Sequence, residues 1–471
     1  LLPVSQARGQ AHMATAVNAP SGGIRGYFAR NRTLDVYPTG FYRWWMLILA
    51  VMATIVLFYE FGLSALLPLW LPGLHFTPEQ FGWFLTGAVF LSGISAMFGG
   101  PLADRHGRVV VIDSCIVVMI LLTFANLLMF NFWSFVLIRG SMNLVAGLAW
   151  GALGGLTRDM SPRTGRGAAF GLLTLGAVAC LWLWNYVPAL TLPLFHTWQS
   201  QIVIMGALAI GLFMPVLFGL KDLAPELRLM VVDSETTGAA YESGEVPLES
   251  GEAAAGFGQL LSHWESWVLV IGVVAFLTTA ITIQNFGPLM FTQAYHYSPA
   301  VADRVTARFW FINLVMLVPA GLFSDWLRVR KPITIVLSLV GVGLLFWWVK
   351  NFFPPLPPAE TGLIALVLGG VLASAYIPWC AYFSEFLEDL SPAIQATGWS
   401  FFQMVYRTWI AFSAPLLLWV AAHYGWQSWM WVTVGGGALF IVSNLAVRGH
   451  WRPAGAPVVT GMQPAHAAGG R

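Results

Sequence analysis

The sequence is poor in charged residues. Asp, Glu, Lys and Arg together make up only 9% of its 471 residues, whereas a soluble domain carries about 25%. Apolar residues account for 58% of the chain, and the mean hydropathy is +0.72. This composition excludes a soluble enzyme, a nucleic-acid-binding protein and a disordered chain, and it indicates an integral membrane protein. The net charge of only +2 gives no reason to expect a polyanionic partner.

The sequence also lacks the motifs that hold cofactors or mark a leader. Its three cysteines lie in apolar runs and form no CxxC or Cys/His cluster, so we expect neither a disulfide framework nor a metal site. Walker, strand-linked GxGxxG and HExxH motifs are absent. We therefore expect a protein that is not an enzyme, binds no cofactor and uses an ion gradient or its substrate's own gradient. Residues 1–40 have no apolar signal-peptide core, and Met13 is a candidate natural start.

Twelve apolar segments are each long enough to cross a bilayer as a helix. A hydrocarbon core about 30 Å thick needs about 20 apolar residues, and these continuous runs lack the alternation of barrel strands. The expected fold class is therefore an all-α membrane protein with 12 transmembrane helices in two six-helix bundles. The segments are 44–70, 81–103, 109–130, 132–156, 167–191, 198–220, 265–291, 308–327, 332–353, 362–384, 396–422 and 426–447.

A polar segment at 223–262 divides the twelve segments into six and six. It holds seven acidic residues against one arginine, which is typical of a solvated, flexible linker. We expect five parts, namely an N-terminal tail, a six-helix bundle, this acidic linker, a second six-helix bundle and a C-terminal tail. In order, the parts are 1–43, 44–222, 223–262, 263–448 and 449–471.

The basic residues predict the orientation of the chain. If the N-terminal tail is cytoplasmic, 18 Lys and Arg residues fall on the cytoplasmic side and three on the other side. Such an excess marks the cytoplasmic side of a membrane protein. Both tails and the linker are therefore expected in the cytoplasm, and the short tails and compact loops suggest a bacterial inner membrane.

Short matches recur between the two halves at nearly one offset. Each match lies in the equivalent gap between spans, which indicates a duplicated six-helix unit and a transporter with its site between the halves. Asp104 and Asp325 lie in the first match, at an offset of 221 residues. The other matches are Asp159-Met-Ser161-Pro162 with Asp389-Leu-Ser391-Pro392, and Trp198-Gln199-Ser200 with Trp426-Gln427-Ser428, at offsets of 230 and 228.

The first of these loops resembles the signature of a known family. The run from Gly100 to Arg108, Gly-Pro-Leu-Ala-Asp-Arg-His-Gly-Arg, has every fixed residue of G-x-L-A-D-R-x-G-R, the loop signature of the major facilitator superfamily. Arg139, with Gly147 eight residues later, is similar to the family's second signature, although the glutamine of that signature is absent. The resemblance covers about residues 40–448. It implies alternating access, in which two bundles rock about a central cavity, in a protein that usually works as a monomer.

The same resemblance suggests a gate at this loop. It implies that Asp104 latches the cytoplasmic side when the transporter faces outward, with a weaker second latch at Asp325. Glycines at turns and basic residues on the cytoplasmic side would complete the loop. The alternative is that the motif sets topology alone. The remaining gating candidates are Gly100, Arg105, Gly107 and Arg108.

Three ionisable residues lie deep in predicted spans, where an ionised side chain costs about 2.5–3.5 kcal/mol. They are Glu60, Arg139 and Arg407, whereas Asp113 lies near a cytoplasmic end that water can reach and is expected to be structural. Glu60 and Arg139 have similar depth, so we expect them to pair. The pair is either a static contact or a proton switch, and Glu60 is then the proton carrier because no histidine lies at mid-membrane. Several proton-coupled sugar and drug transporters of the superfamily use a similar acid and arginine.

Arg407 is the candidate substrate-binding residue. Trp399, Gln403 and Arg407 share one helix face, with Tyr406 beside them. A guanidinium in such surroundings suits a planar carboxylate, which it binds through two hydrogen bonds. The alternative is that Arg407 bonds helix-end carbonyls or Glu60. Further polar and aromatic side chains either line the cavity or only pack the helices; they are Asn285, Thr282, Tyr376, Trp379, Trp182 and Asn185.

These features favour a secondary transporter that imports an organic anion with a proton. Its partners would be a small organic anion, protons and the lipid bilayer, without nucleic acid. The alternative is a proton-coupled antiporter that exports drugs or other amphipathic compounds, with Glu60 attracting the cation. A third interpretation is a sensor or membrane scaffold that transports nothing and uses the acidic linker for docking.

Overall fold

The computed structural model describes residues 32–34, 36–38, 40–62, 64–159, 166–224, 258, 260–327, 329–390 and 395–448. This part of the chain holds 12 helices that are long and apolar enough to cross a membrane. The predicted all-α fold class is thereby confirmed. Most of the predicted acidic linker and both outer tails lie outside the described residues, at 1–31, 225–257 and 449–471, so their cytoplasmic location stays a prediction.

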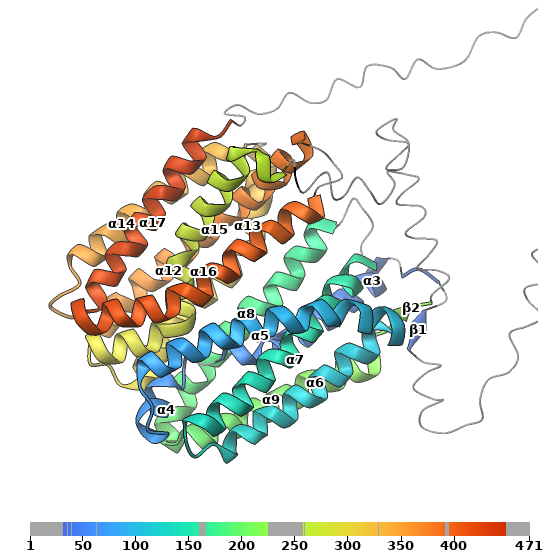
Figure 1. Cartoon of the computed structure of the whole chain (residues 1–471), viewed down its shortest axis with the longest axis horizontal. Helices are drawn as coiled ribbons and strands as arrows, with labels where there is room; N and C mark the ends of the chain where they lie inside the picture. Colours follow the sequence, from blue (N-terminus) through green and yellow to red (C-terminus); the bar gives the residue numbers. More distant parts are fainter. Residues whose placement is uncertain are drawn as a thin grey trace, which may run out of the picture.

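The spans form two bundles of six helices, related in order and connection (Figure 1). The first bundle consists of α3 (Gly40–Leu57), α5 (Pro78–His106), α6 (Arg108–Ala125), α7 (Phe132–Asp159), α8 (Arg166–Phe195) and α9 (Trp198–Gly219). The second consists of α12 (Trp264–Ala294), α13 (Pro299–Leu327), α14 (Lys331–Lys350), α15 (Pro358–Leu390), α16 (Gln395–Tyr424) and α17 (Trp426–Ala446). Short elements complete the fold, namely η1 (Tyr59–Phe61), α4 (Leu67–Gly73), η2 (Asn126–Leu128), β1 (Thr33–Leu34) and β2 (Asp222–Leu223).

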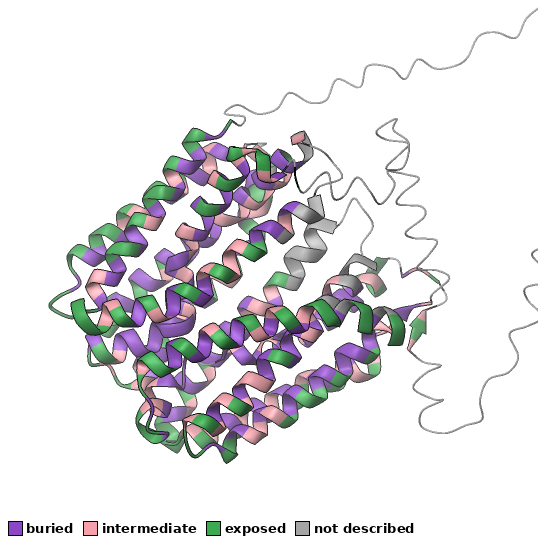
Figure 2. Cartoon of the chain, viewed as in Figure 1, coloured by how far each residue is buried: buried purple, intermediate pink, exposed green. Residues whose placement is uncertain are grey.

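Small residues decide which helix faces meet, because the helices are apolar on all sides and lipid is as apolar as their side chains. A side chain at Gly147 of α7 would collide with Ser92 and Ser95 of α5. In the second bundle, Gly369 of α15 lies equally close to the Phe309 backbone of α13. Gly147 and Gly369 thus allow close packing within each bundle. Buried residues line the faces between helices, and exposed residues lie mainly on the outer faces (Figure 2).

The bundles contact each other through α8 and α13 and, near one end of the molecule, through α5 and α16. We call the end with β1, β2 and Gly107 the tail side, and the opposite end, where α5 and α13 begin, the far side. In the far half, the Thr86 hydroxyl donates to the Ala411 carbonyl at 2.5 Å, and Gly82 packs on Pro415. Figure 1 shows α5 and α16 diverging toward the tail side.

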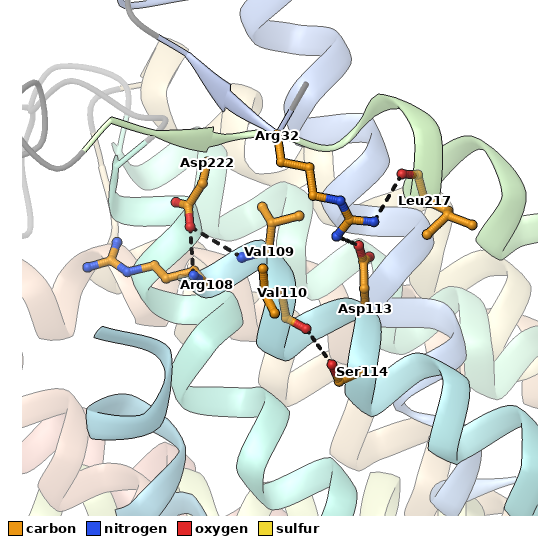
Figure 3. A network of polar contacts seen from close by, with 8 residues as sticks. All are labelled: Arg32, Arg108, Val109, Val110, Asp113, Ser114, Leu217 and Asp222. Carbon is orange, nitrogen blue, oxygen red and sulfur yellow. Dashed lines mark hydrogen bonds and ion pairs between the residues drawn. The ribbon is translucent and has the colours of Figure 1, made fainter. Parts of the chain in front are cut away.

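A network that the sequence did not predict ties the tail side of the first bundle together (Figure 3). Strands β1 and β2 pair in parallel, and the Asp222 N–H donates to the Arg32 carbonyl at 2.6 Å. One oxygen of the Asp222 carboxylate accepts the N–H groups of Arg108, at 2.6 Å, and Val109, at 3.4 Å. Asp222 therefore caps the first turn of α6, whose N–H groups have no partner within the helix.

Asp113 belongs to the same network and has a structural contact, as expected. Its surroundings differ from the expectation, however, because the residue is only 5% exposed and not open to water. Arg32 forms an ion pair with its carboxylate (Figure 3) and also donates to the Leu217 carbonyl at 3.4 Å. The tail residue Arg32 thus supplies the charge that a buried aspartate needs.

The second bundle repeats this connection at the equivalent place. Lys331, the first residue of α14, donates through Nζ to the Val447 carbonyl at 2.6 Å, just after α17 ends. Lys331 lies 223 positions after Arg108, and Val447 lies 225 positions after Asp222. In both halves, the start of the third span is therefore held to the end of the sixth. The predicted duplication extends to contacts that the sequence matches do not include.

Two predicted spans have other bounds in the structure. The segment 44–70 is not one helix, because α3 ends at Leu57 and is followed by η1 and then α4. Gly62 lies against the Trp184 ring within this break, and Pro68 lies in the first turn of α4. The segment 308–327 begins earlier, at Pro299. The first turns of α13 contain charged residues, and for this reason the sequence alone predicted a loop there.

We predict that Asp222→Ala lowers the stability of the protein. The change leaves two N–H groups of α6 without their cap, and the loss of a cap costs about 1 kcal/mol. The thermal unfolding midpoint in detergent should therefore fall. Ser114→Ala is the matched control, because the Ser114 hydroxyl only bonds its own helix at the Val110 carbonyl (Figure 3). Equal midpoints for the two variants would contradict the capping role.

Candidate functional site

The first element of the site is the break after α3. Residues Tyr59 to Phe61 form a single 3₁₀ turn, η1, so the carbonyl groups here leave the α-helical hydrogen-bond pattern. The Tyr59 hydroxyl donates to the Met205 carbonyl of α9 at 3.2 Å, and the Tyr59 ring packs edge-on against Trp184, with centroids 5.2 Å apart. The break therefore holds Glu60, which is 4% exposed, in the interior.

Arg139 of α7 fills this break. Its side chain is fully buried, and Nη2 donates to the Glu60 carbonyl at 2.7 Å and to the Tyr59 carbonyl at 3.4 Å. The guanidinium carbon lies 5.4 Å from the centroid of the Trp70 ring of α4, a cation–π distance. One turn further on, the Asn143 amide donates to the Arg139 carbonyl at 2.9 Å. The cation is thus held by main-chain oxygen and by an aromatic face.

The expected ion pair between the Glu60 and Arg139 side chains is not formed. Within the described residues, Glu60 Oε2 has no hydrogen-bond partner, nor have Nε and Nη1 of Arg139. The Glu60 carbonyl, which the break frees, accepts the guanidinium instead, and so does the Tyr59 carbonyl, which also accepts the Gly62 N–H at 3.1 Å. The two side chains still interact electrostatically. A switch that works by breaking a Glu60–Arg139 hydrogen bond between side chains is therefore not available here.

Arg407 joins this cluster from the other bundle. It lies on α16, is half-buried and interacts electrostatically with Glu60 and with Tyr406. Within the described residues, no hydrogen bond or ion pair engages its guanidinium. The structure thus brings one carboxyl group and two guanidinium groups together across the boundary between the bundles. The alternative role of Arg407 involved a contact with Glu60 or with helix-end carbonyls. The electrostatic interaction with Glu60 is present, and hydrogen bonds to helix-end carbonyls are not found within the described residues.

Several predicted lining residues lie on α16 with Arg407, on α15, or at the contact between the bundles. Gln403 is exposed, and Trp399, Tyr406 and Tyr376 are half-buried. Tyr376 of α15 interacts electrostatically with Tyr406, and Tyr406 with Arg407. On the first bundle, Trp182 of α8 stacks on Tyr186 at 5.1 Å and lies 5.9 Å from Phe311 of α13.

Other predicted lining residues serve helix packing. The buried Thr282 hydroxyl donates to the Thr278 carbonyl at 2.7 Å and accepts the Trp429 indole N–H at 2.9 Å. Trp379 is fully buried and stacks on Phe383 at 5.1 Å. The buried amides of Asn185 and Asn285 donate to carbonyls four residues earlier in their own helices, Leu181 and Ile281.

The loop motif has a clear structural role at one glycine. Gly107 ends α5 and starts α6 with φ of +92°, a conformation that other residues rarely adopt, and a side chain there would meet Asp222 at 3.3 Å. Arg105 is exposed, and the backbone of Arg108 contacts Asp222. The side chains of Asp104 and Asp325, and Gly100, lie outside the described residues, so both latches stay predictions.

Three residues near or beyond this site were missing from the sequence prediction. Trp70 was read as part of a continuous span, and only the proline at 68 and the glycines at 62 and 73 signalled that the span breaks. Arg32 was counted only as a charge on the cytoplasmic side. Asp303 was read as part of a loop, although Pro299 before it is a helix-start signal. Its side chain is fully buried in α13.

The structure thus has twelve spans in two related bundles, with ionisable groups gathered at their boundary. A sequence profile of the Major Facilitator Superfamily matches residues 46–302, which is more than half of the chain, and the chain belongs to this family. The resemblance seen in the loop signature is thereby confirmed.

Two named relatives share part of the chain. It is 25% identical over 291 residues to "Probable anion transporter 3, chloroplastic" of Oryza sativa subsp. japonica, a match that covers 56% of this chain and 55% of the relative. It is 24% identical over 302 residues to the gentisate transporter of Corynebacterium glutamicum, covering 57% of this chain and 64% of that protein. The matched part therefore spans between half and two thirds of these relatives.

Solved structures share the fold over most of the chain. A D-xylose-proton symporter superposes with a TM-score of 0.62 at 15% identity, covering 86% of this chain and 98% of that chain. A bacterial homolog of the human lysosomal transporter Spinster gives a TM-score of 0.63 at 15% identity, with coverages of 87% and 98%. At this identity, the likeness concerns the fold alone.

We predict that Arg139→Ala destabilises the protein far more than Glu60→Gln. Arg139 is bonded to two main-chain carbonyls, of which the Glu60 carbonyl would be left unpaired, and an unpaired buried carbonyl costs about 1–3 kcal/mol. Glu60→Gln removes no hydrogen bond between the two side chains, so the unfolding midpoint should move little. Thermal unfolding of both variants and of the double variant measures the difference. Equal losses in the two single variants would instead indicate a side-chain ion pair.

Proposed function

We propose that this transporter imports an organic anion together with a proton, with Arg407 binding the carboxylate and Glu60 binding the proton. One observation carries the proposal. Arg407 is half-buried at the boundary between the bundles, no hydrogen bond or ion pair within the described residues engages it, and it interacts electrostatically with Glu60. An unneutralised guanidinium at this depth is costly unless an anion joins it.

The charges of the cluster favour symport over antiport. With Glu60 ionised, Arg139 and Arg407 give the cluster a formal charge of +1, and with Glu60 protonated, +2. Protonation therefore strengthens the binding of an anion, and by linkage a bound anion strengthens the binding of the proton. A cationic substrate would have the opposite coupling, in which proton and cation compete. That competition is what a drug/proton antiporter requires.

The size of this coupling depends on the separation between the bound anion and Glu60, which we take as about 8 Å. Two unit charges about 8 Å apart interact by roughly 2 kcal/mol at an effective dielectric constant of about 20. This energy corresponds to an affinity change of roughly thirtyfold between the two protonation states of Glu60. The anion and the proton would then bind together on one side and leave together on the other.

The substrate class that we propose is an aromatic carboxylate. Aromatic side chains with exposed surface lie on α16 with Arg407, on α15, or on α8 at the contact between the bundles, and they are Trp399, Tyr406, Tyr376, Trp182 and Tyr186. They can stack on an aromatic ring while the guanidinium holds the carboxylate. The relatives named as an anion transporter and a gentisate transporter support an anion of this kind. We further propose a monomer in a cell membrane with both tails in the cytoplasm.

We predict that Arg407→Ala abolishes uptake of gentisate by proteoliposomes that contain the purified protein. Arg407→Lys keeps the charge but loses the two-point geometry, so uptake should fall strongly without being abolished. Lys350→Ala, an exposed cation at the far side, is the matched control and should transport normally. A panel of other aromatic and aliphatic carboxylates is run alongside gentisate.

The proposal fails if Arg407→Ala leaves the uptake of every carboxylate in the panel unchanged. Transport of lipophilic cations that survives Arg407→Ala and is lost in Glu60→Gln would favour the efflux antiporter. Binding without transport of either class would favour a sensor or scaffold.

We predict that Glu60→Gln separates exchange from proton-driven uptake. The variant has the charge of the protonated cluster at every pH, so it should still exchange labelled for unlabelled anion across the membrane. It should no longer accumulate anion when an inward proton gradient is imposed. Anion affinity should rise on acidification roughly thirtyfold in the wild type and stay constant in the variant. Accumulation by Glu60→Gln at the wild-type rate would exclude Glu60 as the proton carrier.

A further inference from the structure

Asp303 is a second carboxyl group inside the protein, away from the cluster around Glu60. It lies on the first turns of α13, near the far side, and its exposed fraction is 0%. Within the described residues, neither of its oxygens has a hydrogen-bond partner, and no ion pair or other electrostatic contact engages it. Asp303 has no part in the anion and proton sites proposed above.

No cation faces Asp303 from the helices packed against α13. These helices are α8, α12 and α15, and neither α12 nor α15, nor the part of α8 at 174–195, contains Lys, Arg or His. On α13 itself, Arg304 is exposed, and Arg308 lies against Gly362 of α15. A buried carboxylate without cation or hydrogen bond is so unfavourable that the group binds a proton instead.

The other titratable groups at this end leave the carboxyl group isolated, since His296 is exposed and the Tyr297 hydroxyl is bonded to the Thr361 hydroxyl. Tyr295 follows α12, and its hydroxyl accepts the Trp348 indole N–H at 3.1 Å. Burial raises the pKa of Tyr295, so its hydroxyl is neutral at physiological pH. Glu360 on α15 is exposed, and Tyr186 on α8 is partly exposed. Neither interacts electrostatically with Asp303.

The position of Asp303 around α13 relates it to the boundary between the bundles. Thr306 marks the α12 face, since its hydroxyl lies 3.1 Å from where a side chain at Gly287 would begin. Phe311 marks the α8 face through its contact with Trp182. At about 100° per residue, Asp303 falls between the two, about 60° from Thr306 and about 80° from Phe311. It therefore lies beside the contact through which α13 of one bundle meets α8 of the other.

We propose that Asp303 is a second proton-binding site, held protonated while the far side is closed and exposed to far-side water when α13 separates from α8. On opening, the O–H bond of the carboxyl group breaks, the proton passes to water, and the carboxylate that remains is hydrated. Reclosure then requires a proton from the far side. The site would make closure of the far side depend on a proton, whatever anion is carried.

A proton suits this site better than a metal cation. A cation such as Ca²⁺ needs six or more oxygen ligands, usually from several carboxylates and carbonyls. Within the described residues, no group of three or more His, Cys, Asp or Glu side chains lies close enough to hold a metal ion. A single carboxyl group, in contrast, is sufficient for a proton.

Infrared spectroscopy tests the protonation of Asp303 without any substrate. The carbonyl stretch of a protonated carboxyl group is separate from the bands of a carboxylate. All variants carry Glu60→Gln, so that the interior acid of the proposed anion site does not contribute, and the buried Asp113 is the same in all of them and is paired with Arg32. Near neutral pH, the band should be present in this background, unchanged with Glu360→Gln, lost with Asp303→Asn and shifted with Asp303→Glu. Glu360→Gln is the matched control because it removes an exposed acid from the same side.

The outcomes of this experiment are separate from those of the anion proposal. An unchanged protonated-carboxyl band in Asp303→Asn, or its absence from the parent protein, would overturn the proton site. If Asp303→Asn does not fold, the shifted band of Asp303→Glu still tests the assignment. Since no anion is added, failure to transport gentisate or any other carboxylate leaves this result unaffected.

Transport assays test the coupling role. In proteoliposomes with the carboxylate that is transported, Asp303→Asn should retain exchange at equal pH and lose the acceleration by an inward proton gradient. A merely structural residue would not separate these two activities. Asp303→Glu should restore part of the acceleration. Full acceleration in Asp303→Asn, or loss of both activities in Asp303→Asn and Asp303→Glu alike, would assign Asp303 to packing alone.

Discussion

The bond from Arg139 to the broken first helix is the interaction on which the rest of the site depends. A helix that breaks within a membrane leaves carbonyl groups that lipid cannot satisfy. Arg139 donates to the carbonyls of Tyr59 and Glu60, and the Trp70 ring covers its guanidinium. Because the cation is held by the main chain, the Glu60 carboxyl group is not bonded to it. That group can therefore respond to a proton or to a charge from the other bundle.

The charges of the site are not neutralised within one bundle, and this couples the two bundles electrostatically. Arg407 comes from α16, whereas Glu60 and Arg139 come from the first bundle. Their fields overlap across the boundary, so a ligand that binds Arg407 alters the energy of a proton on Glu60. Rocking of the bundles would change these separations. The same boundary holds the far-side contacts of Thr86 and Ala411.

The packing contacts of the two bundles are duplicated, whereas the ionisable residues of the site are not. Backbone packing is repeated, as in the glycine contacts at Gly147 and Gly369 and in the ties from Asp222 and Lys331. These contacts hold six helices together in each half, and both halves face the same bilayer. The ionisable residues are not repeated, because Glu60 and Arg139 belong to one half and Arg407 to the other. A symmetric scaffold thus carries an asymmetric set of charges.

Hydrophobic runs, basic loops and the Gly100–Arg108 signature were enough to predict twelve helices, the duplication and the family, because a bilayer imposes length and composition on every span. The sequence also singled out Glu60, Arg139 and Arg407, since charges are rare within apolar runs. The sequence could not identify the residues that these three side chains contact. Whether Arg139 meets a carboxylate or a carbonyl depends on where α3 breaks, and the burial of Asp303 depends on the helices around α13. Those relations are distances between segments far apart in the chain, and only the packing of the helices determines them.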